Sequence, residues 1–188
     1  MLIGGKEAPL FYVGPGQVNA QVPVELAADR QLQALVETNG VPSAPEPLQT
    51  AGNRPGIFTL GGKYGNQGAV LIANTNRLAM PVTADVPSQP APLGGLISIY
   101  STGLGPTDPS VGSGEPGPSG PLAVVKTPVT VTIGGQAAAV SFAGLAPGFA
   151  GVFQINAQVP AGVAPGDAVP VVLTQGGFRS NTATIAVR

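Results

Sequence analysis

The sequence contains no cysteine, no histidine and no tryptophan, and only 9% of its 188 residues are charged. Ordinary globular domains carry about 25% charged residues. Without cysteine or histidine, the chain has no disulfides, no thiolate chemistry and no imidazole for catalysis or metal binding. A formal net charge of −1, with no basic patch, argues against binding to a nucleic-acid backbone. No apolar run reaches the roughly 18 residues that a membrane helix needs, so we expect no membrane insertion.

Glycine and proline are abundant instead, with 28 and 21 residues respectively. Such a level often marks disorder, but disordered chains usually combine low hydrophobicity with high net charge. Here 43% of the residues are hydrophobic. We therefore interpret the glycines and prolines as turn residues between many short strands.

A heptad that occurs twice divides the chain into two related units. Gln17 to Pro23 reads QVNAQVP, and Gln154 to Pro160 reads QINAQVP. Flanking segments match as well: Ile3-Gly4-Gly5 corresponds to Ile133-Gly134-Gly135 upstream, and Val36 to Gly40 corresponds to Val172 to Gly176 downstream. A chance match would not extend to both flanks, so the chain contains an internal duplication.

Hydrophobic residues alternate with polar ones in most segments between the turns. In Val129 to Ile133 the valines and isoleucine share one face and the threonines the other, and Ala183 to Val187 alternates in the same way. Glu25 to Glu37 has helix-like leucine spacing, but its counterpart contains two prolines, so we interpret both as a loop followed by a strand. The pattern predicts an all-β fold of two tandem immunoglobulin-like antiparallel β-sandwich modules.

The predicted domains are residues 1–88 and residues 89–188. Only 16 residues precede the first heptad, so the first module is expected to lack its N-terminal strands. It is also expected to contain a hairpin, with arms at Pro55 to Thr59 and Gly68 to Ile72, and a proline-rich connector from Pro81 to Pro92.

The residues that could carry chemistry form no recognisable constellation. The nine acidic residues are scattered through predicted loops, and no spaced series of them resembles a calcium loop. Ser101 and Ser141 have no histidine or lysine base in a recognisable arrangement, and the Gly103-Leu104-Gly105 segment lacks the lysine of a phosphate loop. We therefore predict no catalytic, metal-binding or cofactor-binding residues, and a protein that is not an enzyme.

The polar face of the repeated heptad is the most distinctive surface of the sequence. It consists of six amide side chains: Gln17, Asn19, Gln21, Gln154, Asn156 and Gln158. Amides of this kind bind sugar hydroxyls or bond to neighbouring strands, and their presence in both units favours the structural role. Tyr64 and Tyr100 are the candidate stacking platform for a carbohydrate ligand, with a core role favoured for them.

Four segments resemble a family of immunoglobulin-like repeats. They are Ile99 to Pro106, Ala143 to Gly148, Gln154 to Pro160 and Pro55 to Thr59. The family occurs at the C-termini of large secreted acidobacterial proteins of the Solibacter type and is similar to IPT/TIG domains. The resemblance implies a secreted β-sandwich at an extracellular or cell-surface location. It supplies no activity, substrate or catalytic residue.

These observations lead to two hypotheses about function. The first is a structural protein that assembles with copies of itself into a filament or surface layer, where a donated strand completes the first module. Leu2, Ile3, Leu10 and Tyr12 form the predicted assembly edge. The second hypothesis is an adhesive or carbohydrate-binding accessory module, whose partner is a glycan or a surface protein.

Overall fold

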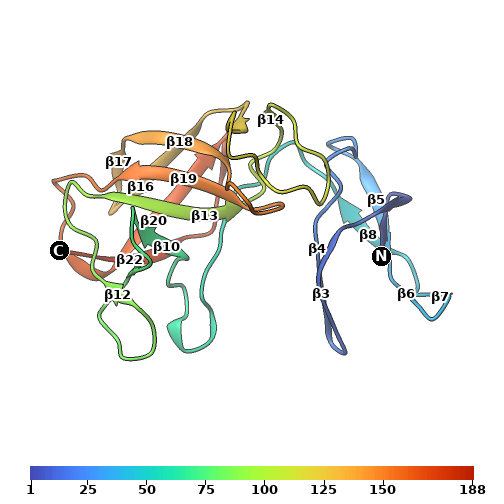
Figure 1. The fold of residues 1–188 in the computed structure, drawn as a ribbon, viewed down its shortest axis with the longest axis horizontal. Coiled ribbons are helices and arrows are strands. Elements are labelled where there is room, and N and C mark those ends of the chain that lie inside the picture. The colour runs from blue at the N-terminus through green and yellow to red at the C-terminus, as the bar shows by residue number, and fades with distance from the viewer.

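The structure is a computed structural model that describes residues 1–188, and it consists of two units at opposite ends of the longest axis of the molecule (Figure 1). Residues 1–50 form the first unit, and the second unit begins near Asn53. Apart from one short 3₁₀ turn, every regular element is a strand. The predicted all-β fold is therefore confirmed.

The first unit contains one small sheet and two separate hairpins. The sheet is antiparallel, with the order β2-β1-β5-β8. One hairpin joins β3 to β4, and the other joins β6 to β7. The strands are β1 (Leu2–Ile3), β2 (Lys6–Glu7), β3 (Leu10–Gly14), β4 (Gln17–Ala20), β5 (Gln31–Leu35), β6 (Glu37–Thr38), β7 (Val41–Pro42) and β8 (Glu46–Gln49).

The second unit contains a nine-stranded and a five-stranded sheet. The nine-stranded sheet comprises β9 (Gly56–Ile57), β10 (Val70–Ile72), β11 (Leu78–Ala79), β12 (Ser88–Gln89), β13 (Leu96–Thr102), β14 (Thr107–Asp108), β15 (Val124–Val125), β18 (Val140–Leu145) and β19 (Phe153–Gln158). The five-stranded sheet comprises β16 (Val129–Ile133), β17 (Gln136–Ala138), β20 (Gly166–Gln175), β21 (Phe178–Arg179) and β22 (Ala183–Val187). The 3₁₀ turn η1 (Gly62–Tyr64) lies between β9 and β10.

The two sheets of the second unit enclose the hydrophobic core of the molecule, which is a cluster of 26 buried residues. All of these residues lie at or after Ile57. Alternation places Ile97 and Ile99 of β13 inward, beside Ile155 of β19, and all three are fully buried. The first unit has no comparable core, because Ile3 and Ala8 are its only buried hydrophobic residues apart from Pro23.

Sheet pairing crosses the predicted boundary at residues 88/89. The predicted hairpin is present, since Thr59 bridges Gly68, but its arms belong to the second unit. β9 pairs with the end of β13 and β10 pairs with its middle. The prediction placed these segments in the first module because they precede the connector in sequence. Their partner strand comes later in the chain, so the structural boundary lies near residue 52 instead.

The position of Gly103 shows how the linker between the units is held against the second unit. A Cβ atom at Gly103, whose φ is +75°, would lie 1.9 Å from the carbonyl oxygen of Arg54. The Arg54 amide donates a hydrogen bond to the Gly103 carbonyl, and the Arg54 guanidinium lies 3.6 Å from the centre of the Phe178 ring. Glycine is required here because the linker backbone passes too close for any side chain.

One further sequence interpretation agrees with the structure and another is wrong. Glu25 to Glu37 contains no helix and forms a loop followed by β5. The proline-rich segment Pro81 to Pro92 includes β12, whose pairing with β11 is parallel. Its Ala91 amide donates to the Ala186 carbonyl of β22, so this segment lies within the second unit and does not connect two modules as predicted.

The difference in packing between the units predicts unequal effects of matched substitutions. Ile155→Ala removes a fully buried side chain and is expected to lower the free energy of unfolding of the second unit by about 2–5 kcal/mol. Val18→Ala changes the corresponding, half-buried residue of the first unit, and we expect about 0.5 kcal/mol or less. Urea denaturation monitored by circular dichroism measures both. Equal losses for the two variants would contradict the assignment of the core to the second unit.

Candidate functional site

The two copies of the heptad form the same local structure. The side-chain amide of Gln154 donates to Asn156 Oδ1 at 2.8 Å, and that of Gln17 donates to Asn19 Oδ1 at 2.6 Å. The residues lie on β19 and β4 respectively. The repeated amides therefore bond along their own strand in both units.

The strand beside each heptad is also reproduced. β18 pairs with β19 with a register shift between Val140 and Phe142, and β3 pairs with β4 with a shift between Leu10 and Tyr12. Phe142 lies opposite Asn156, as Tyr12 lies opposite Asn19. The duplication thus extends to an irregularity of the backbone, which random similarity would not produce.

The five-stranded sheet of the second unit has a counterpart in the first. β16 pairs with β17 and β20, and β1 pairs with β2 and β5. Ile133 faces Val171 and Ile3 faces Ala34, so the structural match of β5 to β20 is displaced by one residue from the sequence match of Val36 with Val172. β22 pairs with β20, and β8 pairs with β5 in the same antiparallel way. The first unit therefore contains one layer of the sandwich together with a single hairpin, β3–β4, of the other layer.

The copies differ in what lies beside the heptad strand. In the second unit β19 has β18 on one side and β13 on the other, paired from Leu96–Gln158 to Ser101–Phe153. In the first unit β4 pairs only with β3, and its other edge has no partner strand. Figure 1 shows β3 and β4 as a separate two-stranded ribbon beside β5 and β8.

This difference leaves apolar side chains of the first unit in contact with solvent. Ile155, Ala157 and Val159 are fully buried, whereas the corresponding Val18 and Ala20 are half-buried and Val22 is 45% exposed. On β3, Val13 is 64% exposed, while the corresponding Ala143 is buried. We take the open edge of β4 and these exposed side chains as the candidate functional site.

The structure places the four residues of the predicted assembly edge in two different environments. Leu10 and Tyr12 are about half exposed on β3, as an assembly surface requires. Leu2 and Ile3 do not lie at an edge, because β1 pairs with β2 on one side and with β5 on the other. The prediction missed the β4 edge, although the heptad match marked β4 as the counterpart of a paired strand.

The two tyrosines of the predicted ligand platform lie on different elements. Tyr100 is on β13, where Ile97, Ile99 and Ser101 face the core and Tyr100 lies on the opposite face. Tyr64 ends η1, and its hydroxyl lies 3.3 Å from Asp85 Oδ2. The Tyr64 hydroxyl is thus bonded to the loop that carries Asp85, whereas Tyr100 lies on the outer face of the nine-stranded sheet.

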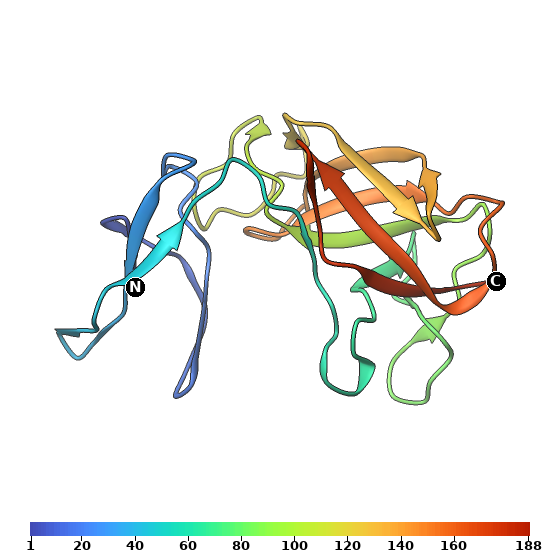
Figure 2. The same ribbon diagram turned by 180° about the vertical axis from the view of Figure 1, so that it is seen from behind.

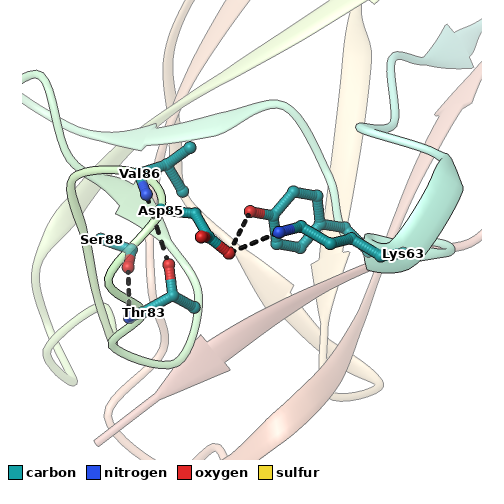
Figure 3. A network of polar contacts seen from close by, with 6 residues as sticks. Lys63, Thr83, Asp85, Val86 and Ser88 are labelled. Carbon is teal, nitrogen blue, oxygen red and sulfur yellow. Dashed lines mark hydrogen bonds and ion pairs between the residues drawn. The ribbon is translucent and has the colours of Figure 1, made fainter.

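Asp85 connects two loops at the surface of the second unit (Figure 3). It accepts a hydrogen bond from Lys63 Nζ, and this contact raises the pKa of Lys63. In the adjoining turn the Thr83 amide donates to Ser88 Oγ, and the Val86 amide donates to Thr83 Oγ1. Both members of the ion pair are more than half exposed, so its contribution to stability is small.

A second polar cluster joins the two units. The Ser113 hydroxyl and amide both donate to the Glu25 carboxylate, at 2.7 and 3.1 Å. The Val24 amide donates to Ser113 Oγ, and the Gly114 amide donates to the side-chain oxygen of Gln21. Figure 2 shows the loop that precedes β15 reaching toward the first unit. The hydrogen bonds from Ser113 lower the pKa of Glu25 below its ordinary value of 4.5.

Two hollows in the surface are lined by no cluster of reactive groups. The larger, of about 580 Å³, is open and lies over β1, β5 and β8, where Gly4, Gln31 and Leu32 are among its lining residues. The other, of about 240 Å³, lies beside Gln158 and Pro160. No three histidine, cysteine or acidic residues gather where they could hold a metal ion. No helix in the structure has the length and hydropathy to cross a membrane.

Comparisons with protein-family models, with curated proteins and with solved structures returned no match.

The junction between the units predicts a measurable pKa change. Because the pKa of Glu25 is lowered in the folded protein, the Glu25–Ser113 contact contributes stability above about pH 4.5, and the contribution is lost as the pH falls through the lowered pKa. Ser113→Ala removes the hydroxyl donor and is expected to raise the Glu25 pKa toward 4.5. An NMR titration of the Glu25 carboxyl carbon measures this shift.

Ser119→Ala is the matched control, because Ser119 lies in the same loop and no hydrogen bond to it is present. The control should leave the Glu25 titration unchanged. A Glu25 pKa that is the same with and without the Ser113 hydroxyl would show that the units are not held together by this contact.

Proposed function

We propose that this protein is a non-catalytic extracellular structural protein that assembles with copies of itself into a filament or surface layer. The observation that carries the proposal is the incomplete layer of the first unit. Side chains corresponding to buried core residues of the second unit are exposed there, and the heptad strand has an unpaired edge. A neighbouring subunit that covers this surface would complete the layer.

The exposed side chains supply a driving force for such a contact. Fully burying one valine or leucine side chain is worth about 1.5–3 kcal/mol. Leu10, Val13 and Val22 are each between 45% and 64% exposed. Burial of several such residues, together with a newly paired strand, offsets the loss of translational and rotational freedom on association.

The low charge of the chain favours close packing between subunits. With eight basic and nine acidic residues in 188, few charges must be desolvated at a contact. β3 and β4 contain no charged residue. The joint would therefore be apolar, and its strength should depend only weakly on salt.

The shape of the molecule suits an open assembly. The first unit and the second unit lie at opposite ends of the long axis, and the N- and C-termini lie in different units (Figures 1 and 2). A contact between the first unit of one copy and a different surface of the next is heterologous, and such contacts produce filaments unless the geometry closes them into a ring. The extracellular location and immunoglobulin-like character are supported by the sequence resemblance and by the scarcity of charge.

Size and morphology of the purified protein test this proposal. We expect light scattering to report masses well above that of one chain and negative-stain electron microscopy to show regular filaments or layers. Val22→Asp puts a charge on the exposed apolar surface and should abolish assembly. Val82→Asp, at a 75% exposed position of the second unit, is the control and should assemble normally. A uniform monomer at all concentrations would overturn the proposal.

One observation favours the alternative of a carbohydrate-binding accessory module. Tyr100 lies opposite Gln154 in the sheet register, on the face that also carries Asn156. An aromatic ring beside amide groups is a common arrangement for binding sugars, because the ring stacks while the amides bond to hydroxyl groups.

The alternative predicts glycan binding that depends on one tyrosine. If a glycan array identifies a ligand, Tyr100→Ala should weaken its binding several-fold, as expected for the loss of one aromatic contact. Tyr64→Ala should have no effect, because Tyr64 lies on a separate loop. Loss of binding in the Tyr64 variant alone would contradict this assignment.

A further inference from the structure

We propose that the open edge of β4 binds an extended strand of the β13 type from a partner polypeptide, antiparallel and in the register that β13 adopts on β19. This inference rests on the proposed function and deepens it by specifying the chemistry of the donated strand. The second unit serves as the template, because it shows the same heptad with its partner strand in place.

The backbone groups of β4 that face the open edge are identified by alternation. The Gln21 amide donates to the Pro9 carbonyl, on the β3 side, just as the Gln158 amide donates to the Ala139 carbonyl. Neighbouring residues of a strand direct their backbone groups to opposite sides. The amides and carbonyls of Val18 and Ala20 therefore point outward, as those of Ile155 and Ala157 point toward β13.

The side chain of Asn19 can accept a hydrogen bond from a strand of the β13 type. In the second unit Asn156 Oδ1 accepts two hydrogen bonds, from Gln154 at 2.8 Å and from the Ser98 hydroxyl of β13 at 3.0 Å. Asn19 Oδ1 accepts only the bond from Gln17. Since a carbonyl oxygen has two lone pairs, a hydroxyl from an incoming strand would complete this site.

The apolar face of the incoming strand is also specified. Ile97 lies opposite Ala157 and Ile99 lies opposite Ile155, and both isoleucines are fully buried. On β4 the corresponding positions are Ala20 and Val18, which are half-buried. A donated strand therefore needs aliphatic residues at these two positions and a serine or threonine between them.

The edges of β2, β7 and β8 are protected against pairing, whereas the β4 edge is not. β2 consists of Lys6 and Glu7, β7 contains Pro42, and β8 contains Glu46 and Pro47. Charges and prolines are the usual means by which proteins prevent strand addition. β4 contains neither.

The outer edge of β3 is a weaker candidate for the same role. Its counterpart β18 pairs with β15 only at Val124 and Gly144. The pairing of β19 with β13, by contrast, extends along the whole heptad strand. By analogy with the second unit, a strand added at the edge of β4 would therefore pair over a longer stretch than one added at the edge of β3.

A labelled synthetic peptide tests the proposal with the full 188-residue chain. The probe is residues 95–103, Gly-Leu-Ile-Ser-Ile-Tyr-Ser-Thr-Gly, with a short lysine tail for solubility. We expect saturable binding by fluorescence polarisation. Ala20→Pro in the protein, which removes one outward amide, should abolish the binding.

Backbone methylation of the peptide provides a control that does not alter the protein. N-methylation at Ile99 removes an amide directed at β4 and should weaken binding by about tenfold or more. N-methylation at Ser98 should have little effect, because the Ser98 amide faces away from β4. Leu96 and Tyr100 form backbone hydrogen bonds on the side of β13 that faces away from β19, and by alternation Ser98 directs its backbone groups to that same side. Replacing Ser98 by alanine should weaken binding several-fold, through loss of the bond to Asn19.

The outcomes separate this proposal from the proposed function. Absence of peptide binding, or equal effects of the two methylations, would overturn the strand site. A dimer that pairs two β4 edges and excludes the peptide would overturn it as well. Peptide binding to a protein that stays monomeric would support the strand site and contradict self-assembly. Filaments that persist unchanged at saturating peptide would support assembly and overturn the β4 edge as its joint.

Discussion

The antiparallel pairing of β13 with β19 is the contact on which the architecture of this protein depends. It joins the heptad strand to the centre of the nine-stranded sheet, and it buries Ile97, Ile99 and Ile155 together. β9 and β10 attach to the far edge of β13, so the linker and the hairpin before it also belong to the second unit. Where this pairing is present, a two-layer core forms. In the first unit it is absent, and the same sequence pattern remains open to solvent.

The contrast between the units provides the functional argument. A duplicated sequence normally forms two similar folds, because the same side chains prefer the same partners. Here the hairpin, the register shift and the amide pair are reproduced, but the neighbouring strand is not. The exposed surface of the first unit is therefore the basis of the proposed assembly, and the other half of the chain shows the kind of strand that we propose to bind there.

The contacts between the units show how the open half is held in position. The loop that contains Ser113 bonds to Gln21, Val24 and Glu25, just beyond the end of β4. These bonds are local and solvent-exposed, whereas the linker is tied to the second unit by Gly103 and by the stacking of Arg54 on Phe178. The loop leaves the β4 edge itself unoccupied.

The sequence by itself determined the all-β class, the duplication and the strand character of each heptad, because alternation and turn residues act over a few neighbouring positions. It did not place the boundary between the units, nor did it show that Leu2 and Ile3 are paired on both sides while the edge of β4 is open. Those features depend on which distant strands pair. β9 and β10 precede their partner β13 by tens of residues, and no local pattern specifies such a long-range contact; only the tertiary structure decides it.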